Sequence, residues 1–137
     1  MRLLFAWAVI LFCSAVMPTS AFAQAGRFEN YEVLREKLDS LVYSRDIASA
    51  LSLFGTYDPE EAKKIEEQVR SLYPRDFENA ALISRDELNN GWRQEVISFW
   101  TETSYLYVYL LMHQRSDALV SIKFQFHSDV LQLDKAF

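Results

Sequence analysis

The fold of this chain is decided by residues 91–128, GWRQEVISFWTETSYLYVYLLMHQRSDALVSIKFQFHS. Three segments in this stretch alternate apolar and polar residues with a period of two, or carry dense β-branched and aromatic residues, and both patterns indicate strands. They are WRQEVISFW (92–100), YLYVYLLMH (105–113) and ALVSIKFQFH (118–127). The connections between them, TETS and QRSD, are short and polar, as turns are. We therefore predict an antiparallel meander.

A further strand is predicted just before this stretch. Residues 77–85 have a weak strand pattern, and Asn89-Asn90-Gly91 follows them. Asn and Gly tolerate the positive φ values that a tight hairpin requires. The expected sheet therefore has about four strands.

Helices are expected in the first half of the chain. Apolar residues recur at spacings of three and four over 28–43, and a second apolar run covers 46–54, with one bent helix as the alternative. A third helix is expected to start at Pro59, because Asp58 is a good N-cap and Pro suits the first helical position. Pro74 marks its end.

The order of these elements predicts the fold class. Helices come first and an antiparallel sheet second, which is typical of an α+β domain with the helices on one face of the sheet. We found no internal repeat or linker, so residues 24–137 are expected to form one domain.

Residues 1–23 have the pattern of a signal peptide. Arg2 is followed by the apolar run LLFAWAVILF, and Ala21-Phe22-Ala23 is a small-x-small cleavage site. We predict cleavage after Ala23 and an exported protein, periplasmic or secreted, with no stable membrane anchor. The alternative is an uncleaved N-terminal anchor.

Cleavage would leave a chain whose composition excludes several kinds of site. Cys13 is the single cysteine and leaves with the signal, so disulfides, thiolate zinc sites and cysteine nucleophiles are excluded. Loss of Arg2 takes the formal charge from −5 to −6, which argues against a nucleic-acid partner or an anionic membrane surface.

The register between the last two strands decides which residues share a face of the sheet. Alternation places one set of apolar residues on a single face of the last strand: Ala118, Val120, Ile122, Phe124 and Phe126. A connection of two or four residues places Tyr105, Tyr107 and Tyr109 on this same face, which we favour. A three-residue connection would place the tyrosines with Ser121, Lys123 and Gln125 instead, giving an amphipathic face suited to a partner or ligand.

The helices, the capped segment DPEEAKKIEEQVRSLYP and the closing YLYVYLLMHQRSDALVSIKFQF together resemble the nuclear transport factor 2-like superfamily. The cystatin-like fold is the near alternative. The first resemblance implies a curved sheet wrapped around helices as a cone, with a cavity that takes a small apolar or aromatic ligand. It also implies functions from ligand binding to isomerase or dehydratase chemistry, and often a dimer through the outer sheet face.

Catalytic candidates are few. His113 and His127 end the last two strands, and Asp129 lies two residues beyond His127, so a histidine–carboxylate pair for acid/base chemistry is conceivable. We interpret both histidines as strand-end residues near solvent. Three or four converging ligands are needed for a metal ion, so we expect neither a metal site nor a cofactor.

Binding candidates are more numerous. Trp100 and Tyr105 flank a connection, and Tyr107 and Tyr109 continue a tyrosine ladder that could equally be ordinary cross-strand packing. Arg93 and Glu95 share a face with Ile97 and Phe99. For Arg93 and Glu95 we favour an exposed strand end, the alternative being buried polar groups that contact a ligand.

These patterns favour a binding or interaction module over an enzyme. A homodimer through the sheet is expected as well, because the central strand is apolar on both faces while the helices cover only one. The competing possibility is that the tail from Val130 to Phe137 folds back over the outer face.

Overall fold

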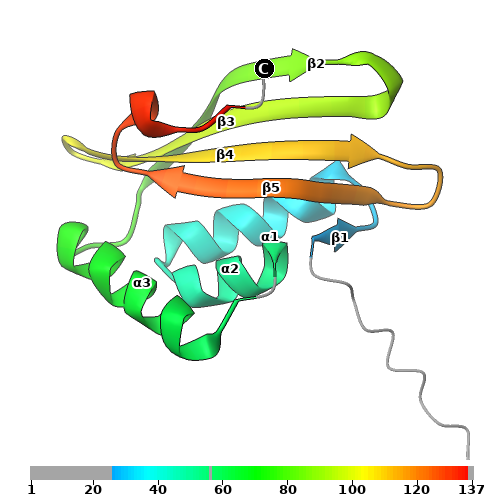
Figure 1. Ribbon diagram of the computed structural model, residues 1–137. Coiled ribbons are helices and arrows are strands. Elements are labelled where there is room, and N and C mark those ends of the chain that lie inside the picture. Colours follow the sequence, from blue (N-terminus) through cyan, green and yellow to red (C-terminus); the bar gives the residue numbers. More distant parts are fainter. Residues whose placement is uncertain (1–25, 56, 136–137) are drawn as a thin grey trace, which may run out of the picture.

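The computed structural model describes residues 26–55 and 57–135 as two layers, a five-stranded antiparallel sheet and three helices packed on one of its faces (Figure 1). The predicted signal peptide lies outside the described residues. The elements are β1 (Arg27–Phe28), α1 (Tyr31–Tyr43), α2 (Ile47–Phe54), α3 (Pro59–Leu72), β2 (Asn79–Glu87), η1 (Asn89–Gly91), β3 (Trp92–Thr101), β4 (Ser104–Gln114), β5 (Leu119–His127) and η2 (Val130–Gln132). The predicted α+β class is confirmed.

All three predicted helices form, and side-chain caps fix where they start. The carboxylate of Asp58 accepts the backbone N–H of Glu60 at 2.8 Å and that of Glu61 at 3.3 Å, which satisfies two free donors of the first turn of α3. Asn30 and Asp46 cap α1 and α2 in the same way. Two helices, rather than one bent helix, therefore precede α3.

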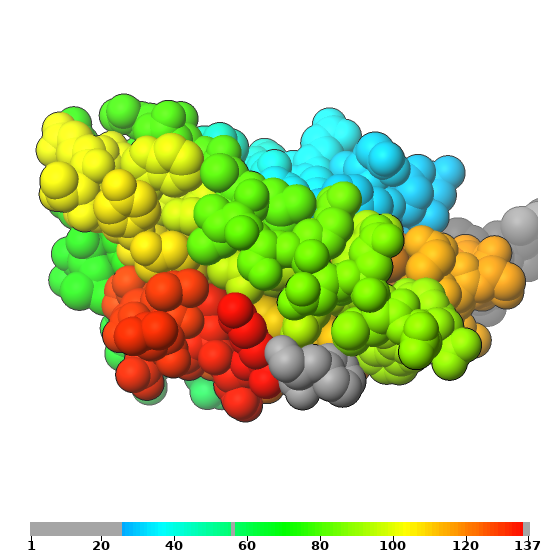
Figure 2. Space-filling model, turned by 90° about the horizontal axis from the view of Figure 1, so that it is seen from above, coloured from blue at the N-terminus to red at the C-terminus, as the bar shows by residue number. Residues whose placement is uncertain are grey.

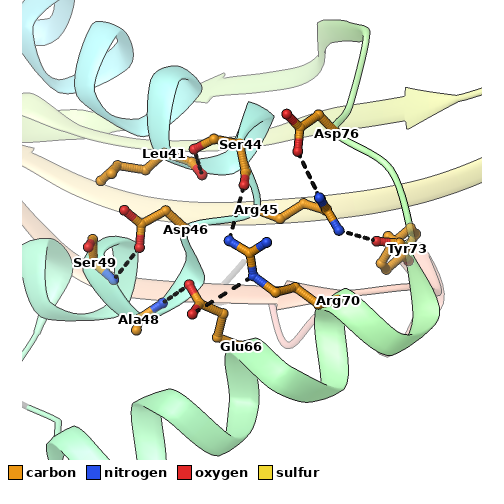
Figure 3. Close-up of polar contacts among 10 residues, drawn as sticks. All are labelled: Leu41, Ser44, Arg45, Asp46, Ala48, Ser49, Glu66, Arg70, Tyr73 and Asp76. Atoms are coloured by element: carbon orange, nitrogen blue, oxygen red, sulfur yellow. Dashed lines mark hydrogen bonds and ion pairs between the residues drawn. The ribbon is translucent and has the colours of Figure 1, made fainter.

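A polar network joins the α1–α2 corner to α3 (Figure 3). Arg45, which has a φ of 56°, binds the carboxylate of Asp76 and donates to the carbonyl of Tyr73 at 2.9 Å. Arg70 donates to the carbonyl of Ser44, and Glu66 accepts the N–H of Ala48. These contacts fix the chain just after α3 against the helical layer.

The sheet has one strand more than expected, in the order β1-β5-β4-β3-β2. The extra strand is β1, whose two residues pair with Val120 and Leu119. The sequence pattern predicted no strand in this part of the chain. Two residues are too few to show a period, and β1 is held by contacts of the preceding Gly26, whose N–H donates to Leu53 and whose carbonyl accepts from Ser121.

A β-bulge in β5 overturns the favoured register. Gln114 pairs with Leu119 around a four-residue connection, as expected, but the pairing shifts at Ile122, so that Tyr109 lies opposite Gln125 and Tyr107 opposite His127. The tyrosines therefore lie on the face opposite the helices, with Gln125 and Lys123. Because a bulge adds one residue to one strand, it sends every later side chain to the other face.

The main core lies between the sheet and the helices. β4 contributes four side chains to it, Leu106, Val108, Leu110 and Met112, each at most 2% exposed. On the other side, here called the outer face, η2 folds back so that Val130 and Leu133 pack against Val96, Tyr109 and Leu111. This part of the tail therefore covers some of the outer face, the arrangement set out above as the competitor of a dimer.

Candidate functional site

A row of three aromatic rings lies on the outer face at the β3–β4 turn. Trp100 is directly opposite Tyr105, and Tyr107 follows two residues along β4. The ring centroids are 6.1 and 6.3 Å apart, and the ring planes differ by 24° and 10°. Tyr105 is 43% exposed and the other two are half-buried. We call Trp100, Tyr105 and Tyr107 the aromatic row.

The backbone under the aromatic row is held from the helical layer. β5 ends opposite Tyr107, so the carbonyl of Tyr105 projects beyond it and accepts the hydroxyl of Tyr73 at 2.6 Å. Burial, with a smaller contribution from Tyr107, raises the pKa of Tyr73, which keeps its hydroxyl protonated and able to donate. Arg45 holds the carbonyl of the same Tyr73 (Figure 3). Hydrogen bonds from the helical layer therefore hold the backbone of the aromatic row in place.

The fourth tyrosine candidate, Tyr109, is buried. Its ring has no exposed surface beneath the tail, and its hydroxyl donates to the side chain of Gln94 at 2.9 Å. Gln94 in turn donates to Asp86 at 3.1 Å. Tyr109 therefore supports the outer face from within and does not belong to the exposed row.

Arg93 and Glu95 lie on the other face of the sheet, toward the helices. The side chain of Glu95 is fully buried and accepts from Arg85 Nε at 2.7 Å and from the hydroxyl of Tyr31 at 2.8 Å. The favoured interpretation of an exposed strand end is therefore wrong for Glu95. A carboxylate removed from water requires such partners, and β2 and α1 each supply one.

Three arginines surround the ring of Tyr31. The guanidinium carbons of Arg85, Arg93 and Arg35 lie 5.1, 5.3 and 5.9 Å from its centroid. The hydrogen bond to Glu95, and then the contact with Tyr31, raise the pKa of Arg85 above its ordinary value. Arg93 also approaches Glu87 at 3.5 Å. Arg35 pairs with Asp39 at 3.3 Å, so each of the three arginines has a carboxylate partner within α1, β2 and β3.

Sequence reasoning missed Tyr31 and Arg85 as partners of Glu95, and it missed Arg35, which donates to the hydroxyl of Tyr31. The strand alternation of β2 carries part of the signal, because Arg85 lies directly opposite Glu95 in the sheet. No sequence signal indicates that α1 contributes a partner of Glu95, because residue spacing does not specify how a helix docks on a sheet. Sequence reasoning also missed Tyr73, because no residue pattern indicates that its hydroxyl reaches the carbonyl of Tyr105.

The two histidines are far apart and bind backbone groups. His113 stacks on Trp92 with centroids 4.4 Å apart, and its Nε2 lies 3.0 Å from the carbonyl of Asn90. His127 Nδ1 accepts the N–H of Asp129, whose carboxylate caps the N–H of Leu131 instead of facing the imidazole. The geometry thus joins His127 and Asp129 without forming an acid/base pair. Across residues 26–55 and 57–135, no three His, Cys, Asp or Glu side chains converge as metal ligands.

Two hollows on the surface of the described residues are large enough to consider as binding sites. A groove of about 860 Å³ lies between α1, α2 and the start of α3, and the apolar side chains in it come from Val33, Leu41, Ala48, Leu53, Pro59 and Ala62. It opens on the side of the helices away from the sheet. A hollow of about 660 Å³ on the outer face is lined by Glu87, Leu88, Asn89, Trp92, Leu111 and Ile122.

Comparison with known protein families, with curated proteins and with solved structures finds no match to this chain. Among the helices that the structure describes, none combines the length and the apolar character that a bilayer crossing requires.

Proposed function

We propose that this protein is an exported binding module that recognises a protein partner through the aromatic row. The observation that carries the proposal is the mounting of Trp100, Tyr105 and Tyr107, nearly parallel and partly exposed, on two central strands. Trp and Tyr dominate the binding energy of protein interfaces, since they offer large rigid contact area at little entropic cost. Export rests on the predicted signal peptide.

Two further observations support binding over catalysis. Both histidines hydrogen-bond to backbone groups and lie at opposite ends of the outer face, which does not suit the histidine–carboxylate isomerase or dehydratase alternative. The carbonyl of Tyr105 is fixed by Tyr73, so the surface is preorganised and loses little freedom on binding.

A separate observation supports a second binding role. The groove between α1 and α2 has a volume in the range of small-molecule sites, roughly 300–1,000 Å³. It is the place we propose for a small apolar ligand, instead of the cavity expected between sheet and helices. The helices-then-sheet order likewise supports a distant relationship to the nuclear transport factor 2-like superfamily, which we put forward as a proposal.

The primary proposal is tested with a displayed library of random peptides selected on the purified protein. The affinity of enriched peptides is then measured for the unchanged protein, for Tyr105→Ala and for Tyr57→Ala. Tyr57 is a matched control because it is 37% exposed, close to the 43% of Tyr105, and precedes α3 in the helical layer. We expect Tyr105→Ala to raise Kd by at least about thirtyfold, the effect of a hot-spot residue, and Tyr57→Ala to leave it unchanged.

Equal affinities for the two variants would contradict the proposal. So would enrichment of no peptide at all. Binding of a soluble polysaccharide through Tyr105 in the absence of peptide binding would assign the aromatic row to a different class of ligand.

A further inference from the structure

Only part of the free edge of β5 is covered by another strand. β1 pairs with the first two residues of β5, and no other strand that the structure describes lies on that side of it. The N–H of Gly26 donates to the carbonyl of Leu53 and not to β5, so the pairing of β1 stops there. β5 itself continues to His127. We call Lys123–His127, which has no partner strand on this side within the described residues, the open edge.

The peptide groups of Phe124 and Phe126 point into the open edge. Ser121 lies opposite a core residue of β4, so its side chain faces the helices, and its N–H donates away from β4 to the carbonyl of Gly26 at 2.6 Å. Residues of one strand whose side chains share a face also direct their peptide groups to the same edge. Phe124 and Phe126 likewise lie opposite core residues of β4. Only solvent or an added strand can satisfy their N–H and C=O groups.

The side chains beside the open edge are aromatic. The ring of Phe124 stacks on Phe54 of α2 with centroids 4.6 Å apart, and the ring of Phe126 lies 6.0 Å from that of Phe124. Both rings of β5 are only half-buried against the main core. An added strand places every second side chain on the same face as these rings, so apolar residues at those positions would be buried favourably.

The tail binds β5 from the outer face and not along the open edge. Figure 2 shows the tail (red) on this face, where Lys123 binds the carboxylate of Asp134 at 2.9 Å and Gln125 accepts the N–H of Asp134 at 2.9 Å. Both contacts use side chains of β5, so they leave the peptide groups of the open edge to another strand. The predicted cleavage after Ala23 leaves too few residues before Gly26 to cover this edge. A segment of another protein is therefore the occupant that fits.

We propose that the open edge of β5 binds an extended segment of a partner protein, which adds to the sheet as a further antiparallel strand. The direction follows β1, which is antiparallel to β5 on the same side. The segment has apolar side chains at alternate positions, on the face of Phe124 and Phe126, and polar side chains between them. In this binding mode the backbone hydrogen bonds supply affinity and the alternate side chains supply specificity. The inference goes beyond the proposed function and does not require it, because it uses β5 and not the aromatic row.

The first test uses a short synthetic peptide in which valine and threonine alternate between terminal lysines. In the antiparallel pairing, the valines opposite Phe124 and Phe126 direct their N–H groups to β5, so N-methylation of the valines removes the shared hydrogen bonds. N-methylation of the threonines, whose N–H groups point away from β5, is the matched control. We expect valine methylation to raise Kd by at least about tenfold and threonine methylation to leave it unchanged.

The second test changes the protein. Phe126→Pro removes the N–H that points into the open edge and leaves the bonds to β4, since proline is tolerated where its nitrogen faces solvent on an edge strand. Phe126→Ala is its control, because it loses the ring and keeps the N–H. We expect Phe126→Pro to bind the peptide at least about threefold more weakly than Phe126→Ala does.

Amide hydrogen exchange of the unchanged protein provides a readout that needs no variant. At a peptide concentration of about ten times Kd, exchange at Phe124 and Phe126 should slow by about tenfold, while exchange in α3 stays the same. No binding of the unmethylated peptide up to about 1 mM, or equal affinities of the two methylated peptides, would overturn the proposal.

Two further outcomes would assign the peptide or the edge differently. A Kd for this peptide that rises in Tyr105→Ala would place the peptide on the aromatic row, which overturns this inference and supports the proposed function. A protein that sediments as a dimer, and as a monomer in Phe126→Pro, would assign the open edge to a second copy and overturn it too. Equal affinities of Tyr105→Ala and Tyr57→Ala for the library peptides would contradict the proposed function and leave this inference standing.

Discussion

Glu95 shows how one residue constrains three elements. Its carboxylate is fully buried in β3, and its two partners come from β2 and α1. The other member of the ion pair, Arg85, is 38% exposed. The pair is therefore asymmetric, because a guanidinium left alone can turn to water whereas a carboxylate left alone cannot.

This asymmetry predicts which half of the pair matters more for stability. Arg85→Ala leaves the buried charge with Tyr31 alone and should lower the free energy of unfolding by about 3 kcal/mol. Glu95→Gln keeps the shape and part of the hydrogen bonding, and should cost about 1–2 kcal/mol. Urea titration measures both values. Arg75→Ala, which breaks the exposed Arg75–Glu102 pair, is the control and should have little effect. A larger loss for Glu95→Gln than for Arg85→Ala would contradict the argument.

Among the elements, the helices and the turns could be predicted because their ends carry chemical signals. Asp58 and Pro59 fix the start of α3, and Asn90 and Gly91 adopt the positive φ values expected of the hairpin, 60° and 81°. The faces of β5 could not be predicted, since the bulge at Ile122 has no signature in composition. In the candidate site, the pairing of Trp100 with Tyr105 could be predicted, because only a short connection separates the two residues. The partners of Glu95 could not be predicted, because tertiary packing brings them together.

The turn η2 provides a test at the scale of one element. Leu133 is 8% exposed and lies in the outer cluster with Val96, Tyr109 and Leu111. Leu133→Ala should therefore lower the free energy of unfolding by about 2 kcal/mol, the low end for a buried leucine, because Leu133 belongs to the tail and packs on the sheet from one side. Leu72→Ala, at an exposed position of α3, should change it by less than about 0.5 kcal/mol. Thermal or urea unfolding measures the free energy of unfolding of both variants. Equal effects of the two substitutions would mean that the tail is not packed as described.

For the whole molecule, the location of the domain depends on its N-terminal segment. The predicted cleavage after Ala23 leaves only Gln24 and Ala25 before the first described residue, Gly26, whose N–H is bound to Leu53. We expect material recovered outside the cytoplasm of an exporting bacterial host to have the intact mass of a chain that starts at Gln24. Substituting Ala21 and Ala23 by Leu should block this processing. A recovered chain that retains Met1 would instead indicate an uncleaved anchor.

The edge strand β2 bears on how the molecule behaves in a crowded compartment. An open strand edge is a template on which further chains can polymerise into fibrils. β2 is interrupted by a register shift between Leu82 and Ser84, and it ends in the charged run Arg85-Asp86-Glu87. Both features hinder the docking of a sixth strand, so the molecule can expose Leu82 and Ile83 at its rim without seeding amyloid growth from this edge.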